Sequence, residues 1–557
     1  MTETKTRRAA LLALALLLAA QLAVLLYYGA MKQNFYVDGY FSFNLGNSRS
    51  PLVEGGSFQW GTTTPEAYAH DYLAVTPGNA LNLRQVWHDQ AVDVHPPLYY
   101  LVIHLLSAVF LRGWRFGPAL RLGLAVNFAF ALGSTALAYD CLRRITGSRA
   151  AALAGAALAA LSPSVIDMAT LVRMYVMAGF FVLLAVRWHL AHWQKPLTRR
   201  GLAGLLAVAA AGILTHYYVL LFLFFMGLWF GVRLLAQRRR RDAAAYAGTL
   251  AGSVALSLAV FPGMYGHLFS SYRGTEAAAN LTDASPAGRL FGQDGMAALL
   301  DRFLLGGRGA LLAAGLAVLW CAALAAFFIR KTGTKKAGAG EAAKASAPRG
   351  GTAAQPAVCP GGAVMLAFTC LCNFVLISKI AAFVTLRYQY FLCLPALIAL
   401  AAAVYFGARA LPGPGRRKAG LALGTAGILA LTAATALSVR PEAYEYLNLD
   451  AGPRKAQIAA SGVTQMVFVG DAGWHTLDFF EEVEGMQTLR YLRPDEVESL
   501  RDAGLAGQRF YLYAATQAAV EPDALVALVQ AVYPQDSITY QFESTFAKVY
   551  LVEPAAA

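Results

Sequence analysis

The chain has 557 residues, of which 57% are hydrophobic and 14% are charged, whereas an ordinary soluble domain has roughly 25% charged residues. This composition excludes a typical soluble enzyme and indicates a membrane protein. The formal net charge of +14 does not indicate a nucleic-acid partner, because the basic residues form short clusters between apolar runs. Residues 1–438 hold 38 Lys and Arg against 15 Asp and Glu, and residues 439–557 hold 8 against 17. A basic, apolar body therefore precedes an acidic tail.

Eleven apolar runs are expected to cross the membrane, and we predict a polytopic helical domain over residues 1–438. Nine of the runs are near the length of about 20 residues that a bilayer requires. These nine lie at residues 9–30, 119–140, 174–192, 217–235, 243–262, 306–329, 362–383, 388–407 and 419–438. Two shorter runs lie at residues 150–163 and 201–215.

The apolar run at residues 97–111 decides the topology. Its 15 residues are short for a span and fit an interfacial helix. If this run lies on the membrane and the other eleven cross it, every strong basic cluster falls on one side, which the bias of Lys and Arg predicts to be cytoplasmic. The N-terminus is then cytoplasmic. The first loop at residues 31–118, the loop at about 263–305 and the tail from about 440 then face outward, toward the periplasm of a bacterial inner membrane.

Two segments lie outside the expected spans of the second half. Residues 330–361, rich in Ala, Gly, Lys and Pro, are predicted to form a cytoplasmic linker. Residues 439–557 alternate strand-like and helix-like runs, which predicts a small periplasmic α/β domain without a visible catalytic motif. The strand-like runs are Met466–Val469, Arg509–Tyr513, Ser537–Phe542 and Ala547–Val552, and the helix-like runs are Pro494–Ala503 and Pro522–Ala531.

Ionisable residues gather at the predicted outer ends of the spans, where a charge beside hydrocarbon is costly and therefore indicates function. Asp38 comes eight residues after the first apolar run, close to the membrane surface. Asp93 stands just before His95 and two prolines, at the start of the interfacial run. Each acid also has a structural alternative. Asp93 would suit a helix N-cap, and Asp38 would suit a solvated loop.

The run Asp93–Tyr100, DVHPPLYY, resembles the first-loop signature of a group of membrane glycosyltransferases. The group contains the protein O-mannosyltransferases and the lipid A aminoarabinose transferase, and the chain is similar to its bacterial, family-39-like members. Four further motifs follow in order, so that the similarity covers most of residues 30–410. They are Ala119-Leu120-Arg121-Leu122, Ser162-Pro163 followed by Arg173-Met174-Tyr175, Thr215-His216-Tyr217-Tyr218, and Arg387-Tyr388. The resemblance implies a GT-C fold and inverting transfer of a sugar from a polyprenyl-phosphate carrier.

The resemblance also implies a catalytic carboxylate. Such enzymes usually carry Asp-Glu in the first loop, and the Asp, which matches Asp38, is catalytic. Two positions depart from the pattern, since Gly39 replaces the usual Glu and Leu171 replaces an acid often found two residues before the Arg-Met-Tyr motif. Asp167 lies four residues before Leu171, nearly on the same helical face, so we expect it to replace the missing acid. The absent acids are plausible metal ligands, which leaves dependence on a divalent metal ion open.

Sugar transfer from a phosphate carrier requires a carboxylate that takes the acceptor's proton and cations that stabilise the departing phosphate. We expect Asp38 to be the base and to share the catalytic site with Asp93 and Asp167. Guanidinium groups match phosphate oxygens in geometry and charge, whereas arginines at span ends also anchor helices by snorkelling. The expected phosphate-binding cations are Arg121, Arg173, Lys379 and Arg387.

Histidines and tyrosines at the outer ends are expected to bind the sugar or the lipid, although an interfacial aromatic belt has the same composition. These residues are His95, Tyr99, Tyr100, Tyr175, His216, Tyr217 and Tyr388. The acceptor is expected to be an envelope glycan, lipid or protein. The alternatives are a polymerase or ligase of lipid-linked oligosaccharides, a lipid-linked sugar transporter or flippase, and an inactive membrane scaffold. The sequence shows no internal repeat of the kind that transporters usually have.

Overall fold

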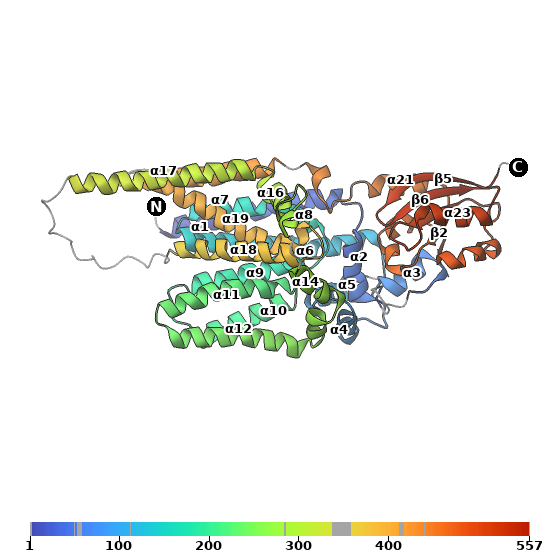
Figure 1. The fold of residues 1–557 in the computed structure, drawn as a ribbon, viewed down its shortest axis with the longest axis horizontal. Helices are drawn as coiled ribbons and strands as arrows, with labels where there is room; N and C mark the ends of the chain where they lie inside the picture. Colours follow the sequence, from blue (N-terminus) through green and yellow to red (C-terminus); the bar gives the residue numbers. More distant parts are fainter. Residues whose placement is uncertain are drawn as a thin grey trace. The chain divides into compact units, whose positions relative to one another are not determined.

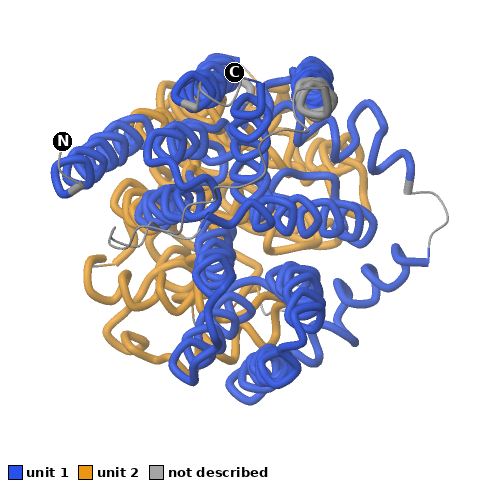
Figure 2. The backbone as a smooth tube through the Cα atoms, turned by 90° about the vertical axis from the view of Figure 1, so that its left-hand side faces the viewer, with its two compact units in different colours: residues 1–26, 128–169, 174–444 blue, residues 27–127, 170–173, 445–557 orange. Residues whose placement is uncertain are grey.

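The computed structural model describes residues 3–48, 51–52, 58–111, 113–282, 286–336, 358–411, 417–438 and 440–555. The chain forms two compact units that alternate along the sequence (Figure 2). Unit 1 consists of residues 1–26, 128–169 and 174–444, and unit 2 consists of residues 27–127, 170–173 and 445–557. Contacts therefore group the first outer loop with the C-terminal domain, which lies more than 300 residues later in the chain.

Long apolar helices make up most of unit 1 (Figure 1). Helix α19 is central, because it packs against α7, α9, α18 and α20, and it is mostly buried along its length. The helices are α1 (Glu3–Met31), α6 (Phe116–Thr146), α7 (Arg149–Ala160), α8 (Pro163–Thr170), α9 (Tyr175–Ala191), α10 (Arg199–Ile213), α11 (Tyr218–Ala236), α12 (Arg240–Val260), α17 (Gly309–Lys336), α18 (Pro360–Ile380), α19 (Leu386–Ala410) and α20 (Arg417–Ala436). Of these, α1, α6 and α8 each have one end in unit 2.

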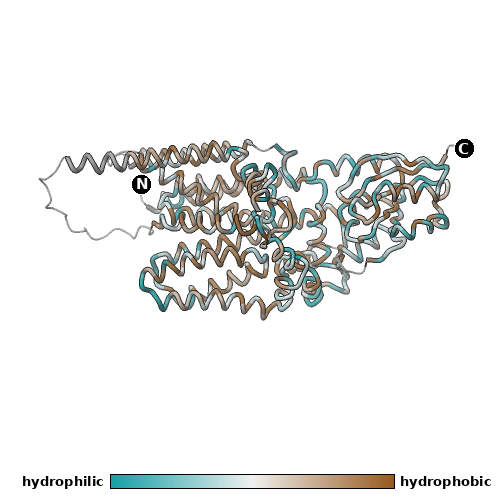
Figure 3. The backbone as a smooth tube through the Cα atoms, in the orientation of Figure 1, coloured by the Kyte–Doolittle hydropathy of each residue, from teal (hydrophilic) through white to brown (hydrophobic). Residues whose placement is uncertain are grey.

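The apolar character of these helices makes the chain a multi-pass membrane protein. Figure 3 shows hydrophobic residues along the helices of unit 1 and a hydrophilic turn between α11 and α12, where the sequence has four consecutive arginines. Within the described residues, seven helices are long and apolar enough to cross a membrane, or up to nine if each of two bent pairs is one span. Helices α9 and α10, with 17 and 15 residues, are shorter than the usual span. The count of eleven therefore stays a prediction.

The predicted loop at 263–305 and the predicted linker at 330–361 both contain helical residues in the structure. The loop at 263–305 forms four short helices, α13 (Gly263–Phe269), α14 (Tyr272–Thr282), α15 (Pro286–Phe291) and α16 (Met296–Leu305), which pack against α12, α18 and α19. Helix α17 continues to Lys336, so the first residues of the predicted linker are helical. Residues 337–357 of that linker lie outside the described residues, and residues 358–361 at its end are described again.

The first loop contributes four helices to unit 2: α2 (Val37–Asn47), α3 (Pro65–Tyr72), α4 (Leu83–Val92) and α5 (Leu98–Phe110). Helices α3 and α4 begin at side-chain caps, since Thr64 and Asn82 accept backbone hydrogen bonds three residues later. Helix α5 is the expected short apolar helix, and its position on the membrane surface stays a prediction. The N-cap alternative for Asp93 is wrong, because Asp93 ends α4 and Pro97 occupies the N-cap of α5.

The C-terminal domain is the predicted small α/β structure, but its sheet is larger than the sequence indicated. The six strands are ordered β1-β3-β2-β4-β6-β5, with β3, β2 and β4 parallel and the outer pairs antiparallel. They are β1 (Gly61–Thr63), β2 (Gln465–Val469), β3 (Thr488–Leu492), β4 (Phe510–Ala515), β5 (Ser537–Ser544) and β6 (Ala547–Glu553). The patterns missed β3, and they missed β1, which the first loop adds to the sheet edge.

Helices cover the two faces of this sheet. One face packs against α23 (Pro522–Val532) and the 3₁₀ helix η3 (Pro494–Asp502), where Leu512 and Val529 are fully buried. The predicted helix at 494–503 is thus 3₁₀ rather than α. The other face carries aromatic side chains, and Tyr491 lies against Tyr68 of the first loop with ring centroids 5.7 Å apart. The remaining elements are α21 (Ala451–Ser461), η2 (Gly473–Leu477) and α22 (Phe480–Val483), with η1 (Pro441–Ala443) preceding them.

Candidate active site

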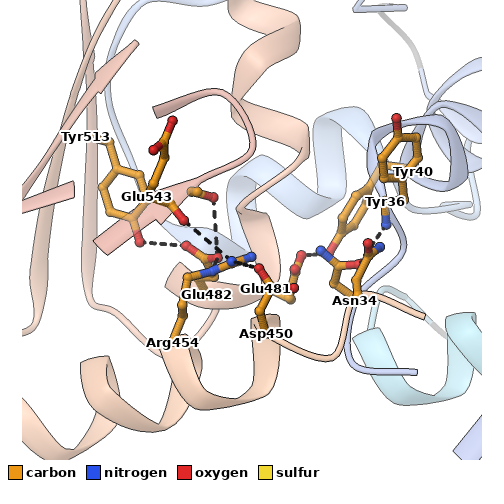
Figure 4. Close-up of polar contacts among 11 residues, drawn as sticks. Asn34, Tyr36, Tyr40, Asp450, Arg454, Glu481, Glu482, Tyr513 and Glu543 are labelled. Carbon is orange, nitrogen blue, oxygen red and sulfur yellow. Dashed lines mark hydrogen bonds and ion pairs between the residues drawn. The ribbon is translucent and has the colours of Figure 1, made fainter. Parts of the chain in front are cut away.

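Asp38 lies in the first turn of α2, where the helix dipole favours a negative charge. The helix begins at Tyr36, a non-glycine residue with φ 60° and ψ 147°. The side chain of Asn34 holds this conformation, because its Oδ1 accepts a hydrogen bond of 3.0 Å from the Tyr36 N–H (Figure 4). A residue in this region of φ/ψ space costs of order 1–3 kcal/mol and persists where its surroundings hold it. The start of the helix that carries Asp38 is therefore fixed by contacts outside the helix.

Arg173 lies beside Asp38 in unit 2, on the short segment that follows α8. Its Nη1 donates a hydrogen bond of 3.2 Å to the main-chain oxygen of Asp38. Ser42, one turn further along α2, donates through Oγ to the main-chain oxygen of Val172 at 2.7 Å. The guanidinium also lies 5.4 Å from the centroid of the Tyr100 ring. The structure thus attaches a buried arginine to the helix turn that carries the expected base.

Asp93 and His95 form the second part of this cluster. The Asp93 Oδ2 lies 2.6 Å from the His95 Nδ1, and the two side chains are 11% and 25% exposed. Burial alone raises the pKa of Asp93, but the charge and hydrogen bond of His95 and the charge of Arg173 together lower that pKa below its ordinary value. Asp93 is consequently ionised at neutral pH, and its negative charge lies beside the His95 ring and the Arg173 guanidinium.

Helix α6 supports the segment that carries Arg173. Asn127 donates through Nδ2 to the main-chain oxygen of Leu171 and accepts through Oδ1 a hydrogen bond of 3.1 Å from the Tyr99 hydroxyl. A Cβ on Gly123 would lie 2.4 Å from a methyl group of Val172, so this position requires glycine for close packing. Tyr99 therefore acts in this structure through Asn127, as a buried support for the Arg173 segment.

Arg121 does not join this cluster, although the sequence suggested a phosphate role. Its side chain is exposed on the first part of α6, next to Gly117. Among the described residues it makes no hydrogen bond or ion pair with the other predicted site residues of unit 2. This position matches the snorkelling alternative that the sequence left open.

Unit 1 brings a separate set of the predicted residues together. The His216 ring lies 5.3 Å from Tyr175 and 5.0 Å from Tyr218, and the Tyr218 ring lies 5.9 Å from Tyr388. The guanidinium of Arg387 lies 5.5 Å from the centroid of its neighbour Tyr388. The predicted aromatic residues at the ends of α9, α11 and α19 thus form one continuous chain of ring contacts.

Two arginines that the sequence analysis missed lie on the helices of the outer loop of unit 1. Arg289 donates to the main-chain oxygens at the C-terminal end of α18, including that of Lys379 at 3.3 Å. Arg273 forms an ion pair of 2.8 Å with Glu276 and lies 5.1 Å from the Phe383 ring. A signal was present, since arginines on a predicted outer loop run against the cytoplasmic bias of positive charge.

The remaining predicted residues of unit 1 have simpler surroundings. Asp167 is fully buried in α8, which ends at Thr170. Leu171 therefore lies beyond the helix, and the argument that Asp167 and Leu171 share a helical face is wrong. Tyr217 contacts His267 through its hydroxyl at 2.8 Å. Lys379 is partly exposed in the last turn of α18.

No group of three or more His, Cys, Asp or Glu side chains that could hold a metal ion occurs in the part of the chain that the structure describes. Asp93, the predicted acid in the same unit as Asp38, pairs with His95. The described residues around Asp38 do not fit a metal site built from protein ligands alone. Metal dependence stays an untested expectation.

Unit 2 also contains a network of buried acids that the sequence did not predict (Figure 4). The Glu482 carboxylate accepts hydrogen bonds from Arg454 Nε at 2.7 Å and from the Tyr513 hydroxyl at 3.1 Å. Burial raises the pKa of Glu482 to about 7 and that of Asp478 to about 6, and it raises the pKa of Glu481 well above its ordinary value. Arg454 thus pairs with Glu482, and its charge also acts to lower the pKa of Asp478.

The chain has the fold of the GT-C membrane glycosyltransferases, and its helices are those of a multi-pass membrane protein. The model of glycosyltransferase family 87 matches residues 94–347, somewhat less than half of the chain. This stretch includes His95, Arg173 and His216, and it begins one residue after Asp93. A search of curated protein sequences gives no match.

Two crystal structures of ArnT from Cupriavidus metallidurans are similar over almost the whole chain. The structure bound to undecaprenyl phosphate has a TM-score of 0.52 and 14% identity, and the match covers 96% of this chain and 97% of ArnT. The apo structure has a TM-score of 0.47 and 14% identity over 98% of both chains. The oligosaccharyltransferase of Archaeoglobus fulgidus has a TM-score of 0.40 and 10% identity, with 96% of this chain and 73% of that chain covered. The likeness to ArnT concerns the fold.

Proposed function

We propose that this protein transfers a monosaccharide from a polyprenyl-phosphate carrier to an envelope glycan, lipid or protein, with inversion, at the outer face of the bacterial inner membrane. The observation that carries the proposal is the pairing of Asp38 with Arg173. The buried Arg173 donates a hydrogen bond of 3.2 Å to the main-chain oxygen of Asp38, in the helix turn that carries the carboxylate. General-base catalysis and stabilisation of a leaving phosphate need these two groups within one cluster.

The residues of unit 2 divide the work of such a reaction. The Asp38 carboxylate takes the proton of the acceptor hydroxyl, while the oxygen of that hydroxyl forms a bond to the anomeric carbon of the sugar. The bond from that carbon to the phosphate oxygen breaks, and the polyprenyl phosphate leaves with the electron pair. Arg173 stabilises the phosphate, and Asp93 with His95 holds the guanidinium charge in place. Attack opposite the leaving group inverts the anomeric centre.

Features of unit 1 support a lipid-linked donor. Its predicted outer end carries Arg273 and Arg387 close to aromatic rings, and Arg289 at the C-terminal end of α18. An apolar cavity of about 440 Å³ lies between α10, α11 and α12 and suits a hydrocarbon tail. The structural neighbour ArnT was crystallised with undecaprenyl phosphate, which is a carrier of the proposed kind.

A transfer assay with Asp38→Asn tests the proposal. Purified protein in lipid is given radiolabelled polyprenyl-phosphate sugars and a membrane extract, and label in an extractable product is measured. We expect Asp38→Asn to lower turnover by at least about 10³-fold, because a neutral amide takes no proton. Asp71→Asn, which removes a half-exposed acid from α3 of the same loop, is the matched control and should leave turnover unchanged.

The assay also separates the alternatives. A flippase would move labelled carrier across a sealed vesicle without forming a product, and its rate would not depend on Asp38. A scaffold would neither move nor consume the label. Turnover retained by Asp38→Asn at the wild-type rate would remove Asp38 as the base.

A further inference from the structure

The first turn of α2 is bounded by the C-terminal domain as well as by Arg173. The Tyr40 hydroxyl, two residues after Asp38, donates a hydrogen bond to the Glu481 carboxylate. The Tyr40 ring also meets Phe480 edge to face, with centroids 6.4 Å apart. Tyr40, Phe480 and Glu481 are all less than 2% exposed. A residue of the expected catalytic helix is therefore fully buried against a segment about 440 positions away in the sequence.

The two sides of α2 have different partners. Side chains two positions apart on a helix point about 200° apart, so Tyr40 and Asp38 project to opposite sides. Ser42, four positions after Asp38, lies on the Asp38 side and donates to Val172. The Arg173 segment thus holds one side of α2 and Glu481 holds the other. The direction of the Asp38 carboxylate depends on both.

The residues just before α2 are held by the same domain. Asn448 donates through Nδ2 to Asn34 Oδ1, the atom that also accepts from the Tyr36 N–H. The Lys32 ammonium donates to the main-chain oxygen of Tyr446, and the Tyr446 ring lies 5.3 Å from that of Tyr36. These contacts surround the residue with φ 60° that starts the helix. They are the external support that a strained backbone requires.

Burying carboxyl groups costs free energy, and the contacts with the start of α2 explain why these acids are buried there. A buried carboxyl without partners costs several kcal/mol, and a small α/β domain gains nothing from placing acids beneath its sheet. Burial raises the pKa of Glu481 well above its ordinary value, which favours the neutral form of this carboxyl. A neutral carboxyl still accepts the Tyr40 hydrogen bond. Its amide isostere, glutamine, should do the same.

We infer that Tyr40 and Glu481 are positioning residues for the general base, and that the C-terminal domain is therefore part of the active-site structure. The inference rests on the proposed role of Asp38. The hydrogen bond between Tyr40 and Glu481 holds the first turn of α2 in the register that directs Asp38 toward the Arg173 side. Loss of this bond leaves the donor-binding residues in place and misdirects the carboxylate.

The test compares Tyr40→Phe, Glu481→Leu and Glu481→Gln in the full-length protein. We expect Tyr40→Phe and Glu481→Leu to lower kcat by about 10- to 100-fold with an unchanged KM for the donor, because a misplaced base affects the chemical step. Glu481→Gln should retain most of the wild-type kcat. The double variant Tyr40→Phe/Glu481→Leu should be no worse than either single variant, since both remove the same contact.

Tyr68→Phe is the matched control. It removes another buried tyrosine hydroxyl between the first loop and the C-terminal domain, at 2.7 Å from Thr476 Oγ1, but on α3 rather than α2. Its kcat should equal that of the wild type at a similar melting temperature. Equal losses of kcat in Tyr40→Phe and Tyr68→Phe would reduce the Tyr40 effect to general destabilisation and overturn the inference.

Hydrogen exchange supplies a second arm that needs no substrate. The amides of α2 should exchange about 10-fold faster in Glu481→Leu than in the wild type and in Tyr68→Phe. Unchanged protection of α2 in Glu481→Leu would overturn the inference even if kcat fell. Faster exchange together with transfer that does not depend on Asp38 would support the contact and count against the proposed function instead.

Discussion

Asp93 and the acids at residues 478–482 of unit 2 have pKa values that are shifted in opposite directions. Asp93, whose side chain is 11% exposed, lies beside His95 and Arg173, and its pKa is lowered. Glu482 shares the single Arg454 with its acidic neighbours, and its pKa is raised to about 7. Desolvation is the largest influence in both places, and it favours the neutral form. The interactions with His95 and Arg173 together outweigh burial at Asp93, whereas the interactions with Arg454 and Tyr513 do not outweigh it at Glu482.

The two opposite pKa shifts fit two different roles of the acids. A charged Asp93 can fix a guanidinium that receives a phosphate, which requires permanent charge. The acids at residues 478–482 lie in a buried network between chain segments, where burial favours the neutral form of each carboxyl.

Removal of the cation beside Asp93 should have the largest effect. Arg173→Ala is expected to lower kcat/KM for the donor by about 10²- to 10³-fold, because it removes a charged donor to the leaving phosphate. The pKa of Asp93 should rise, so the acid limb of the pH–rate profile should move to higher pH. Arg121→Ala, which removes an exposed arginine of α6, is the control and should change kcat/KM less than about 3-fold.

Removal of the cation beside Glu482 should act on stability first. Arg454→Met is expected to destabilise the C-terminal domain by about 3 kcal/mol, because it leaves a buried acid without its partner. Arg509→Met breaks an ion pair with Glu553 in which both side chains are about half exposed, and it should cost less than about 1 kcal/mol. Equal shifts of the melting temperature in the two variants would contradict the assigned role of Arg454.

The pH dependence of stability should be the smallest and most diagnostic effect. The folded-state pKa values of Asp478 and Glu482, about 6 and about 7, lie above the ordinary values near 4, so the folded state binds more protons. Their stabilising contribution is complete below pH 4 and is lost as the pH rises through 6 to 7. Asp93, with a lowered pKa, has the opposite sign, because its contribution is lost only as the pH falls through its folded-state value.

The melting temperature of the full-length protein should therefore fall between pH 5.5 and pH 8. Asp478→Asn should reduce this fall, by up to about 3 kcal/mol in unfolding free energy for a shift of two pKa units. Asp523→Asn, at an exposed position on α23, should leave the slope unchanged. A melting temperature that rises over this range would contradict the raised pKa values.

The sequence predicted the helices and the class of the protein because their signals are local. A long apolar run must satisfy its backbone within itself in a membrane, so its length and composition are sufficient to predict a helix. The ordered motifs indicated the GT-C class, which the structure and the family match confirm. Periodicity in the tail found four of the six strands. It missed β1, whose three residues pair only because the first loop reaches the sheet.

The site was only partly predictable, because its contacts join residues that are far apart in the sequence. The sequence selected Asp38 and Arg173 separately, and their roles stay predictions, but only the tertiary structure placed the arginine on the main-chain oxygen of Asp38. It also decided that Asp93 ends one helix and pairs with His95, and that Arg121 lies apart. No local pattern marks Tyr40 or Glu481, since a tyrosine in an aromatic loop and a glutamate in an acidic tail are both ordinary.

The sequence by itself determined how many apolar segments the chain has, the order of its motifs and the acidic character of its tail, all of which are properties of neighbouring residues. The tertiary structure alone decided which acids are charged and which residues hold the catalytic helix. Electrostatic energy and hydrogen bonding depend on distances and burial across several hundred residues. Those distances exist only once the first loop and the C-terminal domain have packed into one unit.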